Sequence, residues 1–130
     1  MKRGFVIAID GPVASGKGTI SPKLASKLDG FYLYSGAIYR GLALFCLENN
    51  LSIDNEEQIV QNLDRVHLEF DDKIVLLNGV DVTEKIKSPE VAKASSPVAS
   101  YAGVREYFQN LQRAIAQKEI ENGRVVVAEG

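Results

Sequence analysis

The sequence has little of what marks several classes of protein. It contains one cysteine and one histidine in 130 residues, which excludes an internal disulfide and leaves the histidine without metal-ligand spacing. Its N-terminal apolar run breaks at Asp10 and Gly11, so it is too short for a signal peptide, and no other run is long enough to cross a membrane. A net charge of −2 gives no reason to expect nucleic-acid binding. We therefore expect a cytoplasmic protein with neither a membrane nor a nucleic-acid partner.

The composition is that of one soluble globular domain. Hydrophobic residues make up 45% of the chain and charged residues 25%, which suffices for a core, and we find no repeat or low-complexity segment. Cys46 lies on the apolar face of a predicted helix, which indicates a core thiol. His67 stands alone on a predicted strand, which indicates a structural residue.

The N-terminal residues combine a strand, a glycine-rich loop and a helix. Residues 3–10 are apolar and rich in β-branched side chains, which predicts a strand buried on both faces. A helix is expected from about Gly16 to Leu28. Between them, Gly11-x-x-x-x-Gly16-Lys17 has the spacing of a loop whose backbone N–H groups surround a phosphate, with Lys17 reaching the outer phosphates of a nucleotide. The expected phosphate-binding residues are Gly11, Pro12, Val13, Ala14, Ser15, Gly16, Lys17, Gly18 and Thr19.

The hydroxyl that would face a bound Mg²⁺ stands one residue later than in the general form of this loop. Gly18 follows Lys17 directly, and Thr19 comes next. Gly-Lys-Gly-Thr is typical of nucleoside monophosphate kinases. The alternative interpretation is a glycine-rich turn between strand and helix that binds nothing.

The following segment completes a strand–helix–strand unit. Ile20, Leu24 and Leu28 recur every four residues and predict the core-facing stripe of the first helix. Residues 31–34 predict a second strand, parallel to the first.

A second polar group comes directly after that strand. Ser35 is expected to cap a helix that runs to about Glu48. Because ligands of open α/β sheets bind beyond the carboxyl ends of the strands, Ser35, Tyr39 and Arg40 are expected near the phosphate loop, where the planar guanidinium of Arg40 could bind a second phosphate. The alternative is a cap, a packed ring and a surface charge. The inward residues of this helix are expected to include Ile38, Leu42, Phe45 and Cys46.

The middle of the chain predicts a small antiparallel meander. A polar helix is expected at 55–66, with Ile59 and Leu63 inward. Alternating residues and an Asn-Gly turn then predict three short strands. These strands are expected at 67–70, 74–77 and 80–82.

Two helices and a last strand follow. Ser88 and Pro89 open a helix that runs towards Ala99, and Gly103 ends this part. Residues 95–97 suggest either a break in this helix or a local hydroxyl site. The next helix is expected from Val104 to about Glu121, with an apolar stripe. The final strand is expected at 124–129, and its terminal Glu129 would lie near Mg²⁺ or its waters, unless it is simply solvated.

Together these elements predict an α/β fold of the P-loop type, with a parallel sheet between helical layers and an inserted antiparallel meander. Residues 1–34 and 104–130 are expected to form the core. Residues 35–103 are expected to form a second region, with the meander at about 66–82.

The assembled motifs resemble those of the bacterial cytidylate kinase family, which belongs to the nucleoside monophosphate kinases. The similarity rests on residues 11–19, on Ser35-Gly36-Ala37-Ile38-Tyr39-Arg40 and on the stretch from Glu90-Val91-Ala92 to Val104-Arg105-Glu106. It covers essentially the whole chain. The inserted meander is also characteristic of the family.

The resemblance implies phosphoryl transfer from ATP, with Mg²⁺, to CMP or dCMP in pyrimidine nucleotide metabolism. It implies that the loop and Lys17 bind ATP, and that Ser35, Tyr39 and Arg40 hold the CMP phosphate. It further implies that Ser96 and Arg105 bind the cytosine edge, whose acceptors suit such donors. Lys17 and Arg40 are the expected catalytic groups, and Thr19 and Glu129 the expected metal-binding ones.

The sequence departs from the family in two respects. Tyr34 stands where family members commonly have aspartate. The family continues beyond the glycine that matches Gly130 with an Arg-Asp pair, an arginine-bearing lid and further strands. We therefore expect a fragment or shortened copy that binds nucleotide weakly and transfers phosphoryl poorly or not at all. The family is usually monomeric, but an exposed sheet edge would favour self-association.

Two other functions stay open at this point. The first is a nucleotide-binding module without catalysis, which works with a partner chain. The second is a kinase for another acceptor, such as UMP, AMP or shikimate, because the phosphate loop alone does not specify the acceptor.

Overall fold

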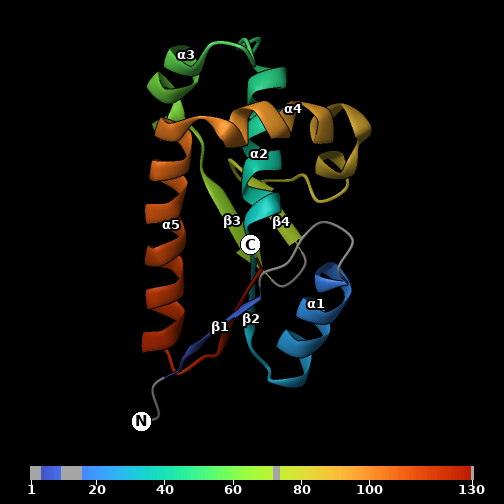
Figure 1. The fold of residues 1–130 in the computed structure, drawn as a ribbon, viewed down its shortest axis with the longest axis vertical. Helices are drawn as coiled ribbons and strands as arrows, with labels where there is room; N and C mark the ends of the chain where they lie inside the picture. Colours follow the sequence, from blue (N-terminus) through green and yellow to red (C-terminus); the bar gives the residue numbers. More distant parts are fainter. Residues whose placement is uncertain (1–3, 10–15, 72–73, 130) are drawn as a thin grey trace. The chain divides into compact units, whose positions relative to one another are not determined.

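A computed structural model describes most of the chain, which falls into two compact units (Figure 1). The described residues are 4–9, 16–71 and 74–129. Unit 1 comprises residues 1–35 and 110–130, and unit 2 comprises residues 36–109. Unit 2 is therefore an insertion within the sequence of unit 1.

Three parallel strands form the sheet of unit 1, in the order β1, β6, β2 (Figure 1). They are β1 Val6–Ile9, β2 Phe31–Tyr34 and β6 Val126–Glu129. The central strand β6 comes last in the sequence, and its Val126 and Val127 are fully buried. The predicted α/β fold with a parallel sheet is confirmed.

β1 is an edge strand, and the expectation that both its faces are buried is wrong. Among the described strands it pairs only with β6. Val6 and Ala8 are exposed, whereas Ile7 and Ile9 are half-buried. A parallel strand is buried on both faces only where other elements cover both, and the helix that follows β1 packs mainly against β6 and β2.

That helix, α1 Lys17–Lys27, has the predicted bounds but turns a different face to the sheet. The expected stripe is wrong, because Ile20 and Leu28 are exposed, and the buried residues are Ser21 and Ala25. Small side chains on the buried face allow a helix to approach a sheet closely. The Ser21 hydroxyl has no hydrogen-bond partner among the described residues.

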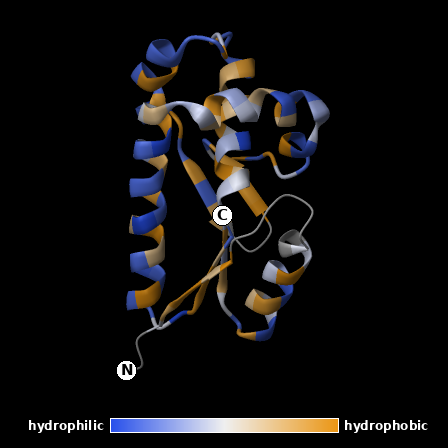
Figure 2. Ribbon diagram, in the orientation of Figure 1, coloured by the Kyte–Doolittle hydropathy of each residue, from blue (hydrophilic) through white to orange (hydrophobic). Residues whose placement is uncertain are grey.

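α2 Ser35–Glu48 supplies much of the core of unit 2. The four inward residues predicted for it are all buried, so this prediction is confirmed. A Cβ atom at Gly41 would lie 2.6 Å from Leu68 Cδ2, so the glycine permits close approach to β3. Figure 2 shows hydrophobic colour in the middle of α2, whereas α5 is hydrophilic over much of its length.

The inserted antiparallel meander is present as predicted. Its strands are β3 Leu68–Asp71, β4 Ile74–Leu77 and β5 Val80–Asp81. Asn78 and Gly79 both have positive φ, 49° and 82°, as a type I′ hairpin turn requires. The preceding helix is shorter than expected: α3 Glu56–Gln61 is followed by the 3₁₀ turn η1 Leu63–Arg65, and Ile59 and Leu63 are buried as predicted.

After the 3₁₀ turn η2 Lys85–Lys87, two helices meet at a single residue. α4 Pro89–Ser100 is capped by the Ser88 hydroxyl, which accepts from Val91 N–H at 3.2 Å. The predicted break in α4 is wrong: the helix continues through Pro97. α5 Ala102–Glu121 begins directly after Tyr101, so Gly103 lies in its first turn rather than at an end.

None of the helices in the described part of the chain combines the length and the apolar content needed to cross a bilayer.

Candidate functional site

The end of β1 and the start of α1 frame the predicted phosphate loop. Gly11, Pro12, Val13, Ala14 and Ser15 lie outside the described residues. Gly16 precedes α1 with φ of 92°, a left-handed conformation that disfavours any other residue, and its carbonyl accepts from Thr19 N–H and Ile20 N–H, each at 3.1 Å. The N–H groups at the start of a helix point along its axis and attract anions. Lys17 and Gly18 form the first turn of α1, where Thr19 is exposed.

Glu129 is buried at the carboxyl end of the central strand, with 4% of its surface exposed. Register places it beside Ile9 of β1 and Tyr34 of β2. Its Oε1 accepts a hydrogen bond from the Tyr32 hydroxyl at 2.9 Å. Burial, the hydrogen bond to Glu129 and its negative charge raise the pKa of Tyr32, so the phenol remains a donor throughout the physiological range.

Ser35 joins the start of α2 to the same strand end. It is the first residue of the helix, and its hydroxyl donates to the Glu129 backbone carbonyl at 3.3 Å. The sequence predicted a helix cap at this position, and the structure instead shows a link between α2 and β6.

Tyr32 is the residue of this group that the sequence analysis missed. Its ring stacks on that of Tyr34, with centroids 6.1 Å apart and planes 4° apart. The available signal was the alternation of β2: Phe31 and Leu33 are buried, whereas the two tyrosines share the other face.

Tyr39 and Arg105 both lie in unit 2. Tyr39 is half-buried in α2 and packs edge-on against Phe108 of α5, at 6.0 Å between ring centroids. Burial raises the pKa of Tyr39, and the positive charge of Arg105 opposes that rise, so the guanidinium lies within electrostatic range of the phenol.

Arg40 and Ser96 stand apart from this pair. Arg40 is half-buried in α2, and Ser96 is exposed on α4. Among the described residues, neither makes a hydrogen bond or an ion pair with another candidate residue.

The described residues offer oxygen ligands rather than a preformed metal cluster. No group of three or more His, Cys, Asp or Glu side chains in the described ranges is placed to hold a metal. The Thr19 hydroxyl and the Glu129 carboxylate are both hard oxygen donors, the type that Mg²⁺ prefers, and Mg²⁺ commonly takes only one or two protein ligands beside nucleotide phosphates. The residues present therefore fit a nucleotide-bound Mg²⁺.

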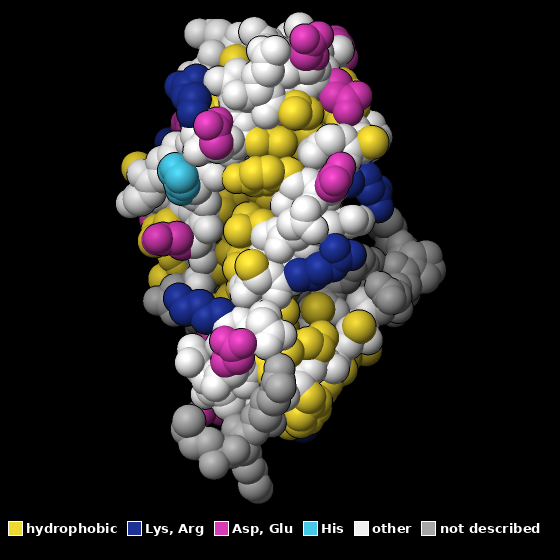
Figure 3. All heavy atoms as spheres, turned by 90° about the vertical axis from the view of Figure 1, so that its left-hand side faces the viewer, with side chains coloured by type: hydrophobic (Ala, Val, Ile, Leu, Met, Phe, Trp, Pro, Cys, Tyr) yellow, Lys and Arg dark blue, Asp and Glu magenta, His cyan; other side chains and the backbone are white. Residues whose placement is uncertain are grey.

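The lone cysteine and histidine lie elsewhere. Burial raises the pKa of the Cys46 thiol to about 11, so it stays protonated in the core of unit 2, as predicted. His67 is exposed just before β3 (cyan in Figure 3).

Comparison with known proteins places both units within one family. A model of the family described as Cytidylate kinase matches residues 7–130. A protein named Cytidylate kinase from Aster yellows witches'-broom phytoplasma (strain AYWB) is 46% identical over 113 residues, which cover 87% of this chain and 51% of the relative. Proteins of the same name from Bacillus thuringiensis (strain Al Hakam) and Bacillus cereus (strain AH187) are each 40% identical over 122 residues, or 91% of this chain and 54% of theirs. The chain thus spans about half the length of the curated relatives it matches.

Proposed function

The chain belongs to the cytidylate kinase family, and we propose that it is the nucleotide-binding part of a kinase that transfers the γ-phosphoryl group of ATP to CMP or dCMP. The observation that carries the proposal is the extent of the family match. It runs from β1 to the end of β6 and so includes all of unit 2 as well as the phosphate-loop segment. We further propose that this activity serves pyrimidine nucleotide metabolism in the cytoplasm.

Unit 1 is the proposed site of the phosphoryl donor. The segment from Gly11 to Thr19 would surround the ATP phosphates with backbone N–H groups, and the N-terminus of α1 would add its dipole. Mg²⁺, when bound, neutralises phosphate charge, and Thr19 and Glu129 would hold it directly or through water. The Tyr32 hydroxyl supports this role because it orients the Glu129 carboxylate.

Unit 2 is the proposed site of the acceptor. Tyr39 and Arg40 follow Ser35, the unit 1 residue at which α2 begins, and these three residues would hold the CMP phosphate. Arg105, close to Tyr39, and Ser96 would bind the cytosine edge. Uracil presents a carbonyl where cytosine presents an amine, so a site built for cytosine would leave a polar group unpaired against uracil.

The transfer needs positioning and charge neutralisation rather than a covalent nucleophile. An oxygen of the CMP phosphate attacks the γ-phosphorus of ATP and forms a new P–O bond. The bond from that phosphorus to the β–γ bridging oxygen breaks, and ADP leaves with the electron pair. Lys17 would neutralise the transferring group, while Arg40 would keep the attacking phosphate in line.

A nucleotide-binding module that works with a partner chain is the second candidate function. It is favoured by one observation: β1 pairs on one side only among the described strands. A kinase for another acceptor, such as UMP, AMP or shikimate, would keep the role of unit 1 and change that of unit 2.

Calorimetric titration of the purified chain tests these proposals. We expect CMP to bind in preference to UMP, and an ATP analogue to bind with Mg²⁺. Replacing a cation that pairs with phosphate or base costs about 1.5–3 kcal/mol, or roughly 10- to 100-fold in affinity. Lys17→Met should show this loss for the ATP analogue and not for CMP, and Arg105→Met the reverse, so that each variant is the control for the other.

Each other outcome selects a different function. Equal binding of CMP and UMP, unaffected by Arg105→Met, would contradict cytosine recognition by unit 2. Binding of the ATP analogue alone would favour the non-catalytic module. Tighter binding of another acceptor than CMP would favour the other small-molecule kinases.

A further inference from the structure

The two residues proposed to bind cytosine lie on different helices that meet at one residue. Ser96 is in the last two turns of α4, and Arg105 is in the first turn of α5. Tyr101, in extended conformation with φ of −75° and ψ of 128°, is the whole connection. The position of Arg105 relative to Ser96 therefore depends on the backbone of Tyr101.

Tyr101 is held from both sides. Its carbonyl accepts from Arg105 N–H at 2.9 Å, which closes the first turn of α5. Its hydroxyl donates to the carbonyl of Ile53 at 2.7 Å, in a segment 48 residues earlier in the sequence. This bond is short and spans a long sequence separation, so it constrains the junction against the loop before α3.

A second contact joins the same two segments. Gly103 N–H donates to Glu56 Oε2 of α3 at 3.3 Å. A Cβ atom at Gly103 would lie 2.9 Å from Val60 Cγ2, closer than such atoms normally approach, so a side chain there would force either Val60 or the start of α5 to shift. The start of α5 is therefore seated on α3 by both a hydrogen bond and a close backbone approach.

The other side of α5 faces the residues proposed for the acceptor phosphate. Tyr39 of α2 packs against Phe108, one turn beyond Arg105, and lies within range of the Arg105 charge. A shift of α5 would thus change the distance of Arg105 from α2 as well as from Ser96.

We propose that Tyr101, with Gly103, is a positioning residue for nucleobase selection: it braces the α4–α5 junction against α3 and so places Arg105 to distinguish cytosine from uracil. This inference rests on the proposed function, because it assumes that Arg105 reads the base. Neither Tyr101 nor Gly103 need touch the nucleotide.

The test measures CMP and UMP affinities of the chain by calorimetry. Tyr101→Phe keeps the ring and removes only the hydroxyl. We expect the CMP-over-UMP preference to fall at least threefold, while the affinity for the ATP analogue stays within twofold. Tyr107→Phe is the matched control, since it removes the hydroxyl of an exposed tyrosine on α5, and it should leave the preference unchanged.

A rescue experiment separates positioning from a loss of folding. Gly103→Ala should also lower the preference, because the new Cβ meets Val60. Adding Val60→Ala removes the methyl groups that the new Cβ would meet and should restore the preference. Circular dichroism of each variant verifies that it is folded. If Tyr101→Phe does not fold, the comparison of Gly103→Ala with the Gly103→Ala/Val60→Ala double variant still tests the proposal.

The outcomes separate the two proposals. If the unmodified chain prefers CMP and both Tyr101→Phe and Gly103→Ala keep that preference, the brace is only structural and the inference is overturned. If the unmodified chain does not distinguish CMP from UMP, the proposed base recognition fails first, and the inference fails with it.

Discussion

Most of the buried hydrophobic residues in the described part of the chain lie in unit 2, and only a few lie in unit 1. Both units also expose some large apolar side chains, such as Val80 of unit 2 at 58%. In unit 2, Ile38, Ile59 and Phe108 are completely buried. In unit 1, apolar side chains remain exposed on β1 and α1, including Val6 at 45% and Ile20 at 58%. Hydrophobic side chains are also visible between charged ones on the face drawn in Figure 3.

The difference follows from how the two kinds of sheet are assembled. An antiparallel meander pairs strands that are neighbours in sequence, so unit 2 completes its sheet within a few residues. A parallel sheet needs crossovers, and the strand beside β1 comes from residues 126–129. The other edge of β1 has no partner among the described strands, and such an edge presents free backbone groups to any further strand.

The largest expected effect is on the free energy of unfolding, when isoleucine is replaced by alanine in a helix of each unit. Ile38→Ala should lower the free energy of unfolding by about 2–5 kcal/mol, because it removes buried methyl groups and leaves a cavity. Ile20→Ala, also in a helix, should change it by less than about 0.5 kcal/mol because Ile20 is exposed. Urea denaturation followed by circular dichroism measures both. Similar losses would mean that Ile20 contributes to the core of unit 1 as Ile38 does to that of unit 2.

The second effect concerns the polar link at the end of the parallel sheet. Tyr32→Phe leaves the buried Glu129 carboxylate without its hydroxyl donor, which should cost about 1–3 kcal/mol of stability. Tyr34→Phe on the same face of β2 is the control, and we expect about 0.5 kcal/mol or less. The same denaturation experiment applies. Equal effects of the two substitutions would show that the hydrogen bond contributes nothing particular to unit 1.

The third effect tests the open edge directly. We expect the chain to self-associate as its concentration rises, through β1. A charge on an edge strand opposes such pairing, so Val6→Lys should weaken association by about tenfold, or 1.4 kcal/mol. Sedimentation velocity over a range of concentrations measures this. Val80→Lys places the same charge on the edge strand β5 of unit 2 and should have little effect; if it acts equally, the difference between the units is not in their edges.

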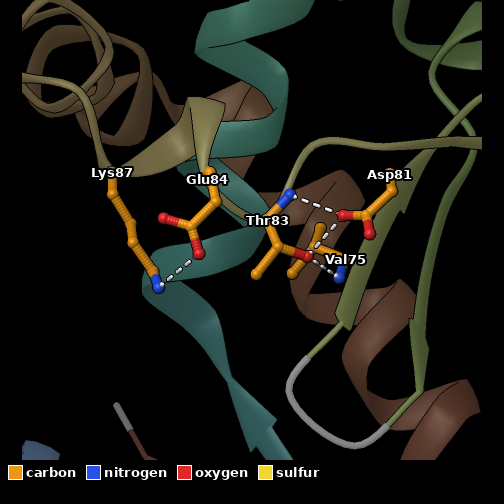
Figure 4. Close-up of polar contacts among 5 residues, drawn as sticks. All are labelled: Val75, Asp81, Thr83, Glu84 and Lys87. Atoms are coloured by element: carbon orange, nitrogen blue, oxygen red, sulfur yellow. Dashed lines mark hydrogen bonds and ion pairs between the residues drawn. The ribbon is translucent and has the colours of Figure 1, made fainter.

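The smallest effect is a pH dependence in the meander of unit 2 (Figure 4). The Asp81 carboxylate accepts from the Thr83 hydroxyl at 2.7 Å and from Thr83 N–H at 3.0 Å, and the same hydroxyl accepts from Val75 N–H at 3.0 Å. The hydrogen bonds from the Thr83 hydroxyl and N–H lower the pKa of Asp81.

Because the folded pKa is lowered, the stabilisation is present above the unfolded pKa of about 3.9 and is lost as pH falls below it. Thermal unfolding between about pH 5 and 2.5 should therefore show a smaller loss of stability in Asp81→Asn than in the unmodified chain. Asp64→Asn, at another exposed aspartate of unit 2, is the control. The effect is small because Asp81 is exposed to solvent. An unchanged pH profile in Asp81→Asn would contradict it.

Local patterns predicted most elements but not which side of them is buried. The prediction for α2 was correct in its bounds and in its buried face, because the helix has enough apolar residues to specify which face turns inward. The prediction for α1 was correct in its bounds but not in its buried face. The spacing of Ile20, Leu24 and Leu28 is a valid amphipathic pattern, yet the chain turns Ser21 and Ala25 inward.

Proline and glycine usually indicate a break or an end of a helix, and at two positions that prediction was wrong. Pro97 and the adjacent serines suggested a break, but α4 continues, and the Ser95 hydroxyl donates to the Ala92 carbonyl at 2.7 Å. Gly103 suggested an end, but its missing Cβ serves the approach of α5 to α3. The first contact is local, whereas the second joins residues far apart in sequence and cannot be read from neighbours.

The sequence by itself determined the order of the elements, the parallel directions of the core strands, the antiparallel meander and the family, because strand, turn and cap signals are local and the motifs are short. The phosphate loop stays a prediction, because its central residues lie outside the described part. Only the tertiary structure decided that β6 lies between β1 and β2, that Tyr32 meets Glu129 and that Tyr101 meets Ile53. Those contacts join residues 48 and 97 positions apart, and their geometry depends on how whole helices and strands pack against one another.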